Sequence, residues 1–162
     1  MEDRVERGKQ WLESILSLMG VAASVSSEGF AKITEDQDSC WLNIQGDRLT
    51  KEQIQLLIGD KGKNIDAIQY LANTLLNIEQ DAESQGSYTV EIGSYRVNRY
   101  QELRELVDRA TEAVRSTGEE QEISGLSSAE RKQIHYLFQD SSELATESRG
   151  QEPDRKLIVK TR

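Results

Sequence analysis

Two glycines and two lysines fall together at residues 59–63, where the chain reads Gly-Asp-Lys-Gly-Lys. Glycine lets a backbone approach a ligand closely. The first amides of a helix that follows such a turn carry the positive end of the helix dipole, so they attract anions. The ammonium groups of Lys61 and Lys63 would add charge. The pattern therefore predicts a turn that holds a phosphate, and the remaining question is which molecule carries that phosphate.

Nucleotide-binding loops fit this turn poorly. If Gly62-Lys63 closed a P-loop, the first glycine position would hold Leu57 and the magnesium-binding hydroxyl position would hold Asn64. The dinucleotide pattern needs three glycines after a strand, whereas two glycines follow a helical pattern here. A GxxG turn between two helices fits better, with the backbone of a single-stranded nucleic acid as its ligand. The alternative is an ordinary helix–helix connection, because glycine often ends helices.

A second candidate site is formed by Arg131 and His135, which are four residues apart and therefore neighbours on one helical face. They flank an apolar stripe rather than join it, so we expect both side-chain tips to reach solvent; the stripe consists of Ile134, Leu137 and Phe138. Arginine can clamp a phosphate or stack on a base, and histidine can stack or donate a hydrogen bond. The alternative is a solvated helix edge whose histidine bonds a backbone carbonyl.

Other cations could enlarge this second patch. Lys132 lies on the same helix, and two more follow near the end of the chain, Arg155 and Lys156. These last two would join the patch if the final strand packs beside the helix.

The sequence gives little indication of a metal site, a redox site or a catalytic nucleophile. The chain has one cysteine, Cys40, and one histidine, so an internal disulfide, a zinc site and a Cys–His pair are not expected. Cys40 lies beside Trp41 in an apolar segment, which predicts a small core residue. None of the 29 acidic residues is singled out as a general acid or base. We therefore expect no metal, no cofactor and no catalysis.

Composition and charge restrict the class of protein further. The 162 residues are 36% hydrophobic and 30% charged, which predicts a soluble globular chain with one ordinary domain or two small ones. No apolar run approaches membrane-spanning length and no signal-like segment opens the chain, so we expect a cytoplasmic protein. The net charge is −9, and residues 1–93 hold 16 acidic against 8 basic residues. A nucleic-acid surface must then be a local patch.

The elements that would position the first site follow from periodicity. Residues 9–20 and 63–78 show helical spacing, and residues 21–25, 40–44 and 88–92 alternate as strands do. Thr50 and Gln53 form a capping box that opens a helix, and Gly59 ends that helix. Residues 1–93 thus predict the order helix, strand, strand, helix, glycine turn, helix, strand, which is a two-layer αββααβ domain.

The rest of the chain predicts a long helix and a smaller domain. Residues 95–116 keep helical spacing up to Gly118, and we assign 94–120 to a linking helix. The acidic residues Glu119, Glu120 and Glu122 predict a solvated linker at its end. Residues 121–162 form the second domain. In it Ser127 and Glu130 open a short helix, Pro153 lies in a turn, and Leu157 and Val159 alternate as one final strand.

Two segments resemble a known family. IGDKGKNIDAIQYLANTLLN, residues 58–77, resembles the KH domain of the Jag/KhpB (SpoIIIJ-associated) family of bacterial RNA-binding proteins. SAERKQIHYLFQDSSELATESRGQEPDRKLIVK, residues 128–160, resembles that family's R-three-H (Arg-x-x-x-His) domain. The resemblance covers nearly the whole chain and places two linked motifs in the family's order. It implies a short form without the separate N-terminal Jag domain.

The resemblance also implies a fold and a function. The fold is α+β, with a type II-like KH domain at 1–93, a linking helix at 94–120 and a small α/β R-three-H domain at 121–162. The function is non-enzymatic binding of single-stranded RNA, with single-stranded DNA as a second candidate, in post-transcriptional regulation linked to bacterial envelope growth or division. The resemblance implies that the GxxG loop binds RNA through Gly59, Asp60, Lys61, Gly62 and Lys63. It also implies that Arg131 and His135 of the Arg-x-x-x-His motif bind nucleic acid.

One departure from the family pattern matters for affinity. The family's loop is usually more basic, whereas this loop carries Asp60, with Asp66 one turn further on. The alternative function is therefore a protein-interaction or dimerisation module with weak RNA affinity. The resemblance implies two candidate protein partners, a second copy of the chain or a small single-KH protein.

Overall fold

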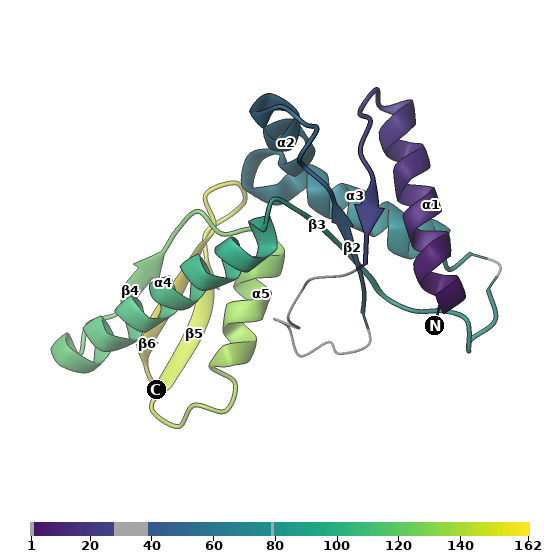
Figure 1. Cartoon of the computed structure of the whole chain (residues 1–162). Coiled ribbons are helices and arrows are strands. Elements are labelled where there is room, and N and C mark those ends of the chain that lie inside the picture. Colours follow the sequence, from purple (N-terminus) through teal and green to yellow (C-terminus); the bar gives the residue numbers. More distant parts are fainter. Residues whose placement is uncertain (1, 28–38, 79) are drawn as a thin grey trace. The chain divides into compact units, whose positions relative to one another are not determined.

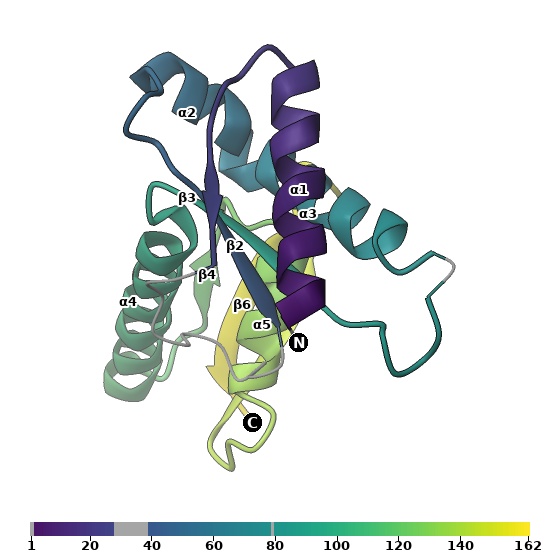
Figure 2. The same ribbon diagram turned by 45° about the vertical axis from the view of Figure 1, so that its right-hand side comes forward.

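The computed structural model describes residues 2–27, 39–78 and 80–162, and the chain forms two compact units, 1–97 and 98–162 (Figure 1). Each unit combines helices with a small three-stranded sheet (Figure 2). The predicted α+β class is therefore confirmed. Within the described part of the chain, no helix combines the length and the apolar character that a membrane span requires.

The first unit has the predicted order of elements. In sequence it contains α1 (Glu2–Leu18), β1 (Val25–Ser26), β2 (Cys40–Ile44), α2 (Lys51–Ile58), a 3-10 turn η1 (Asp60–Gly62), α3 (Lys63–Leu75) and β3 (Tyr88–Ile92). The central strand β2 pairs antiparallel with β1 and parallel with β3. The strand expected at 21–25 begins only at Val25, although the carbonyl of Ser24 already accepts from the N–H of Gln45 at 2.9 Å.

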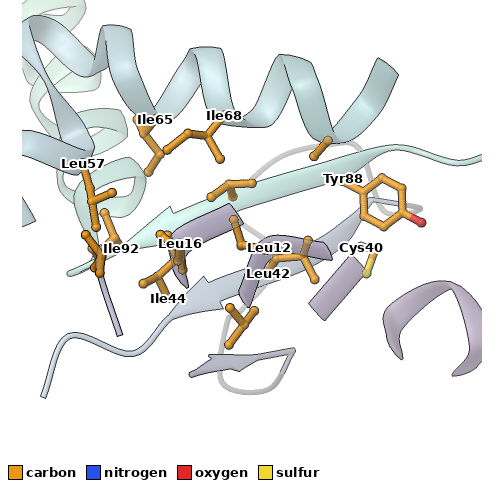
Figure 3. Packing of buried hydrophobic residues seen from close by; sticks show 14 of the residues in the cluster. Leu12, Leu16, Cys40, Leu42, Ile44, Leu57, Ile65, Ile68, Tyr88 and Ile92 are labelled. Atoms are coloured by element: carbon orange, nitrogen blue, oxygen red, sulfur yellow. The ribbon is translucent and has the colours of Figure 1, made fainter. Parts of the chain in front are cut away.

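The core of the first unit lies between the helices and the sheet. Ile65 and Ile68 extend from α3 toward the strands, and Leu12 and Leu16 of α1 meet the same cluster (Figure 3). Cys40 is buried in this cluster, as the sequence predicts. Burial of these residues fixes which face of α3 is turned inward, and this determines what the opposite face presents.

Side-chain amides fasten α3 to the outer edge of β3. Asn73 donates to the carbonyl of Tyr88 and accepts from its N–H, both at 2.8 Å. Gln69 accepts from the N–H of Val90 at 3.0 Å, and Asn77 pairs with Gly86 in the way that Asn73 pairs with Tyr88. Residues 69, 73 and 77 are spaced four apart, so they form one row along the helix. This amide row fixes the rotation of α3 about its axis.

The second unit contains most of α4 (Tyr95–Thr117), then β4 (Gln121–Ile123), α5 (Ser128–Leu137), β5 (Leu144–Arg149) and β6 (Lys156–Thr161). The sheet order is β4-β6-β5, with both pairs antiparallel. The sequence predicted only the last strand. Glu122 lies in β4 rather than in a solvated linker, so that prediction was wrong. Helix α4 supplies Leu103, Ala110 and Val114 to the core of this unit.

The stripe predicted for the short helix α5 is correct at two of its three positions. Ile134 and Phe138 are buried, whereas Leu137 is 47% exposed. Helix α5 ends at Leu137 and Phe138 leaves helical geometry, with φ −98° and ψ 0°. The turn that follows the helix therefore buries Phe138 and leaves Leu137 at the surface.

Candidate nucleic-acid interface

The loop between α2 and α3 is a tight turn that contains three residues with positive φ. Gly59 has φ 73° and its N–H donates to the carbonyl of Gln55 at 2.8 Å, which ends α2. Lys61 and Gly62 also have positive φ, at 51° and 80°. At the other end of α2, the predicted capping box of Thr50 and Gln53 is confirmed. Local hydrogen bonds therefore hold α2 at both of its ends.

Both loop glycines are required by close packing inside the turn. A Cβ on Gly59 would lie 2.8 Å from the backbone nitrogen of Asn64, and a Cβ on Gly62 would lie 2.6 Å from the hydroxyl of Tyr95. Asn64 also closes the turn, because its Nδ2 donates to the carbonyl of Leu56 at 2.6 Å. The folded turn thus explains both glycines without a ligand, and it leaves Asp60 and Lys61 exposed.

Two cations of this loop have no acidic partner among the residues that the structure describes. Lys61 and Lys63 are exposed and form no ion pair with any residue that the structure describes. The N–H of Lys63 donates to the carbonyl of Asp60, whereas the next N–H groups of α3 have no partner within that helix, as at every helix start. Amides and ammonium groups thus meet at one helix N-terminus, which is the arrangement that suits a phosphate.

The two acids of the loop region differ in their surroundings. Nη2 of Arg96 lies 2.9 Å from Oδ1 of Asp66, close enough for an ion pair although the N–H does not point at the oxygen. Arg96 also donates from Nε to the carbonyl of Val90 at 2.7 Å. Asp66 is therefore compensated by a neighbouring cation. Asp60 has no such ion pair among the described residues, so its charge would oppose an anion at this turn.

Glu91 is a positioning residue that the sequence pattern did not reveal. Its carboxylate is fully buried and accepts from the N–H of Ile92 at 2.8 Å and from the N–H of Arg96 at 3.0 Å. A carboxylate at the start of a helix satisfies free amides and suits the dipole. It thereby fixes the first turn of α4, which brings Tyr95 against Gly62 and Arg96 against Asp66.

At the second candidate site, the expectation of an exposed arginine tip was wrong. Arg131 is only 4% exposed. Its Nη1 donates to the carbonyl of Leu126 at 2.8 Å and more weakly to the carbonyl of Arg155 at 3.5 Å, and its Nη2 bonds Glu152. The loop between β5 and β6 folds back over α5 and encloses the guanidinium. Arg131 therefore joins the start of α5 to this loop.

His135 is half-buried and bonds two hydroxyls of β5. Its Nδ1 lies 2.6 Å from Oγ1 of Thr146 and its Nε2 lies 2.9 Å from Oγ of Ser148. These partners are hydroxyls, not the backbone carbonyl that the alternative interpretation expected. Burial lowers the pKa of His135, and the positive charges of Arg131 and Arg155 lower it further. The imidazole is accordingly neutral near pH 7.

The structure brings Arg155 to this site but places Lys156 elsewhere. The carbonyl of Arg155 accepts a hydrogen bond from Arg131, and the positive charge of the Arg155 side chain lowers the pKa of His135. Leu157 and Val159 of β6 face the core, so Lys156 faces the other side of the sheet. There it pairs with Glu122 at 2.6 Å. Lys132 is exposed on α5 and forms no ion pair with the described residues.

Ion pairs occupy most cations of the far side of this sheet. Arg149 pairs with Glu120 at 2.5 Å and also with Glu147, which in turn pairs with Lys160. These long side chains lie around Ile158, which is fully buried on that face. The basic residues near the end of the chain are thus largely neutralised. Among the residues described, no group of three or more His, Cys, Asp or Glu side chains could hold a metal ion.

Comparison with known families assigns a class to the second unit. Residues 101–161 match the family described as the R-three-H domain. The matched range runs from α4 to the end of β6 and includes Arg131 and His135.

Three relatives share the name RNA-binding protein KhpB. The protein of Clostridium symbiosum is 26% identical over 157 residues, which cover 95% of this chain and 64% of that protein. The Lactiplantibacillus plantarum protein is 31% identical over 107 residues, covering 66% of this chain and 33% of that protein. The Bacillus subtilis protein is 25% identical over 162 residues, covering 97% of this chain and 70% of that protein. The chain thus spans less than two thirds of the length of the first two relatives. These similarities support the resemblance of this chain to the Jag/KhpB family.

Proposed function

We propose that this chain is a non-catalytic protein that binds single-stranded RNA through two sites. One is the GxxG turn of residues 59–63 in a type II-like KH domain, and the other lies around His135 in the R-three-H domain. The observation that carries the proposal is the match of residues 101–161 to the R-three-H family, together with similarity along 95% of the chain to a protein named as RNA-binding. Lys61 and Lys63 at the start of α3, which form no ion pair within the described part of the chain, support the same function.

At the first site, the RNA backbone would lie across the start of α3. The first-turn amides would bind a phosphate as a ligand, and Lys61 and Lys63 would supply the positive charge. Asp60 weakens this attraction, whereas the pairing of Asp66 with Arg96 limits the effect of the second acid. We therefore expect specific but modest affinity at this site.

At the second site, the contacts with RNA would fall to the residues around Arg131 rather than to Arg131 itself. Arg155 and Lys132 are exposed cations near the half-buried imidazole of His135. Arg131 would hold the loop that carries Arg155 in place. Because both sites are on one chain, binding at one raises the effective concentration at the other. Two weak sites then give a useful overall affinity.

The test is fluorescence anisotropy with a labelled, unstructured RNA. We expect Lys61→Asp and Arg155→Gln each to weaken binding. The control is Arg109→Gln, which removes an exposed cation of α4 that has no ion pair among the described residues. Circular dichroism checks each fold. Absence of binding by the wild-type protein, or equal loss in the control, would contradict the proposal.

A second candidate function has its own supporting observation. Leu71, Leu75 and Ile78 are exposed apolar residues in one row along α3 and its end. Such a row fits a protein-interaction or dimerisation module with weak RNA affinity, with a second copy or a small single-KH protein as partner. Light scattering of the purified chain, with Leu75→Asp beside the wild type, tests this function. A mass that the substitution lowers would favour it.

The wider role belongs to the same proposal. The relatives' name and the two-domain order support post-transcriptional regulation in the bacterial cytoplasm, linked to envelope growth or division. Sequencing of RNA that co-purifies with the cross-linked chain would test this role. Recovery of defined messages lost in Lys61→Asp would support it.

A further inference from the structure

Tyr70 is the one aromatic residue of α3, and 70% of its surface is accessible. It belongs to neither hydrophobic core. An isolated surface tyrosine needs no explanation. Tyr70 differs from an isolated surface tyrosine because it lies on the helix that begins at the GxxG turn, where the proposed RNA would bind.

Tyr70 lies in line with a loop lysine. Successive helical residues are rotated by about 100°, so Tyr70, seven residues after Lys63, lies only about 20° from it around the axis and roughly 10 Å along it. Both side chains are exposed. A strand whose phosphate is held beside Lys63 would therefore run past the ring of Tyr70 if it followed α3.

The rotation of α3 is firmly set, so this alignment is a property of the fold. Ile65, Ile68 and Ala72 are buried beneath the helix. The amide row of residues 69, 73 and 77 bonds the edge of β3. Tyr70 is adjacent to this row and is turned toward solvent. Gln69 uses its Oε1 on Val90, and its Nε2 has no hydrogen-bond partner among the described residues. A donor thus lies next to the ring.

We propose that Tyr70 is a stacking platform for one base of the RNA whose phosphate binds at the GxxG turn. This proposal rests on the proposed RNA-binding function. A tyrosine ring offers a flat apolar face to any base, so stacking adds affinity with little sequence preference. The free amide of Gln69 would add one hydrogen bond to the edge of the stacked base. A stacked base also adds affinity that does not depend on charge, which compensates for Asp60.

The experiment combines protein and RNA substitutions. Anisotropy is measured for the wild type, Tyr70→Ala, Tyr70→Phe and Leu71→Ala, over a series of salt concentrations. We expect Tyr70→Ala to bind roughly tenfold more weakly, with an unchanged slope of log K against log salt because no phosphate contact is lost. Tyr70→Phe keeps the ring and should bind as the wild type does. Leu71→Ala removes an exposed neighbour about 100° away on the helix and should have no effect.

A second arm locates the base. An abasic nucleotide is moved through the RNA one position at a time. In the wild type, one position should lose affinity about as much as Tyr70→Ala does, and in Tyr70→Ala that position should lose nothing more. Equal abasic losses in both proteins, or wild-type affinity in Tyr70→Ala, would overturn the stacking role alone. Failure of the wild type to bind any RNA would instead overturn the proposed function. An equal loss of RNA affinity in Leu71→Ala and Tyr70→Ala would show that the effect is not specific to the ring of Tyr70, and would overturn the stacking role.

Discussion

Arg131 shows how a residue predicted to bind a ligand can instead hold a site together. Its sequence position suggested an exposed tip, but the guanidinium is enclosed by the loop between β5 and β6 and bonds Leu126 and Glu152. Helical periodicity could predict that Arg131 and His135 share a face. It could not predict the burial of Arg131, because that depends on a loop that is about twenty residues away in the chain.

We expect Arg131→Ala to destabilise the second unit. The substitution leaves the buried carbonyl of Leu126 without its donor, which costs about 1–3 kcal/mol. Glu152→Gln serves as the control. It removes only the charge of a half-exposed partner, and such pairs contribute about 1 kcal/mol or less. Urea unfolding measures both variants. A smaller loss for Arg131→Ala than for Glu152→Gln would contradict the positioning role.

His135 makes the stability of the second unit depend on pH. Burial and the charges of Arg131 and Arg155 lower its pKa in the folded state. The unfolded chain, with a histidine pKa near 6.5, then binds the proton more readily, so this contribution to stability is complete above about pH 7 and is lost as the pH falls through the folded pKa. Urea unfolding at about pH 7.5 and pH 5.5, on either side of that ordinary histidine pKa, should show a larger drop for wild type than for His135→Gln. Equal drops in the two proteins would show that His135 does not titrate in this way.

At the scale of elements, the helices and the strands β2, β3 and β6 could be predicted, whereas β4 and β5 of the second unit could not. The capping boxes at Thr50 and Ser127 and the end of α2 at Gly59 are local signals, and the structure confirms each of them. Strand β5 reads LATESR, and both of its faces are polar because Thr146 and Ser148 turn inward to bond His135. An alternation of apolar and polar residues is absent there, so nothing in the sequence pattern indicated a strand.

Substitution by alanine should destabilise the protein more at Gly59, inside the GxxG turn, than at Gly20, which is surrounded by open space. Gly59 and Gly20 both have positive φ, 73° and 77°, and Gly59 combines it with ψ 177°, which only glycine readily adopts. A Cβ on Gly59 would press on the backbone of Asn64, whereas a Cβ on Gly20 meets nothing within 4 Å. Gly20→Ala should cost only the left-handed strain of about 1–2 kcal/mol. Thermal unfolding should show a clearly larger loss for Gly59→Ala, and equal losses would contradict the close packing of the turn.

At the scale of the whole molecule, net charge and ion pairing would limit the proposed binding of RNA. The chain carries −9, and acidic neighbours occupy Arg149, Lys156 and Lys160. The candidate phosphate contacts are therefore few, and consist of Lys61, Lys63, Lys132 and Arg155. Four contacts to a single strand predict a slope of log K against log salt near −3, from about −0.7 per contact. Anisotropy over a salt series measures the slope. A slope twice as steep would mean that the ion-paired residues also bind phosphate.

The central claim is that single-stranded RNA binds at the start of α3. The most direct test is to record ¹H–¹⁵N NMR spectra of the labelled chain while a short single-stranded RNA is added. The account predicts that the amide signals of Lys61, Gly62, Lys63 and Asn64 move in proportion to binding, while those of α1 stay in place. Binding that leaves these four signals unmoved would contradict the claim, and the amides that do move would then identify the surface that RNA contacts.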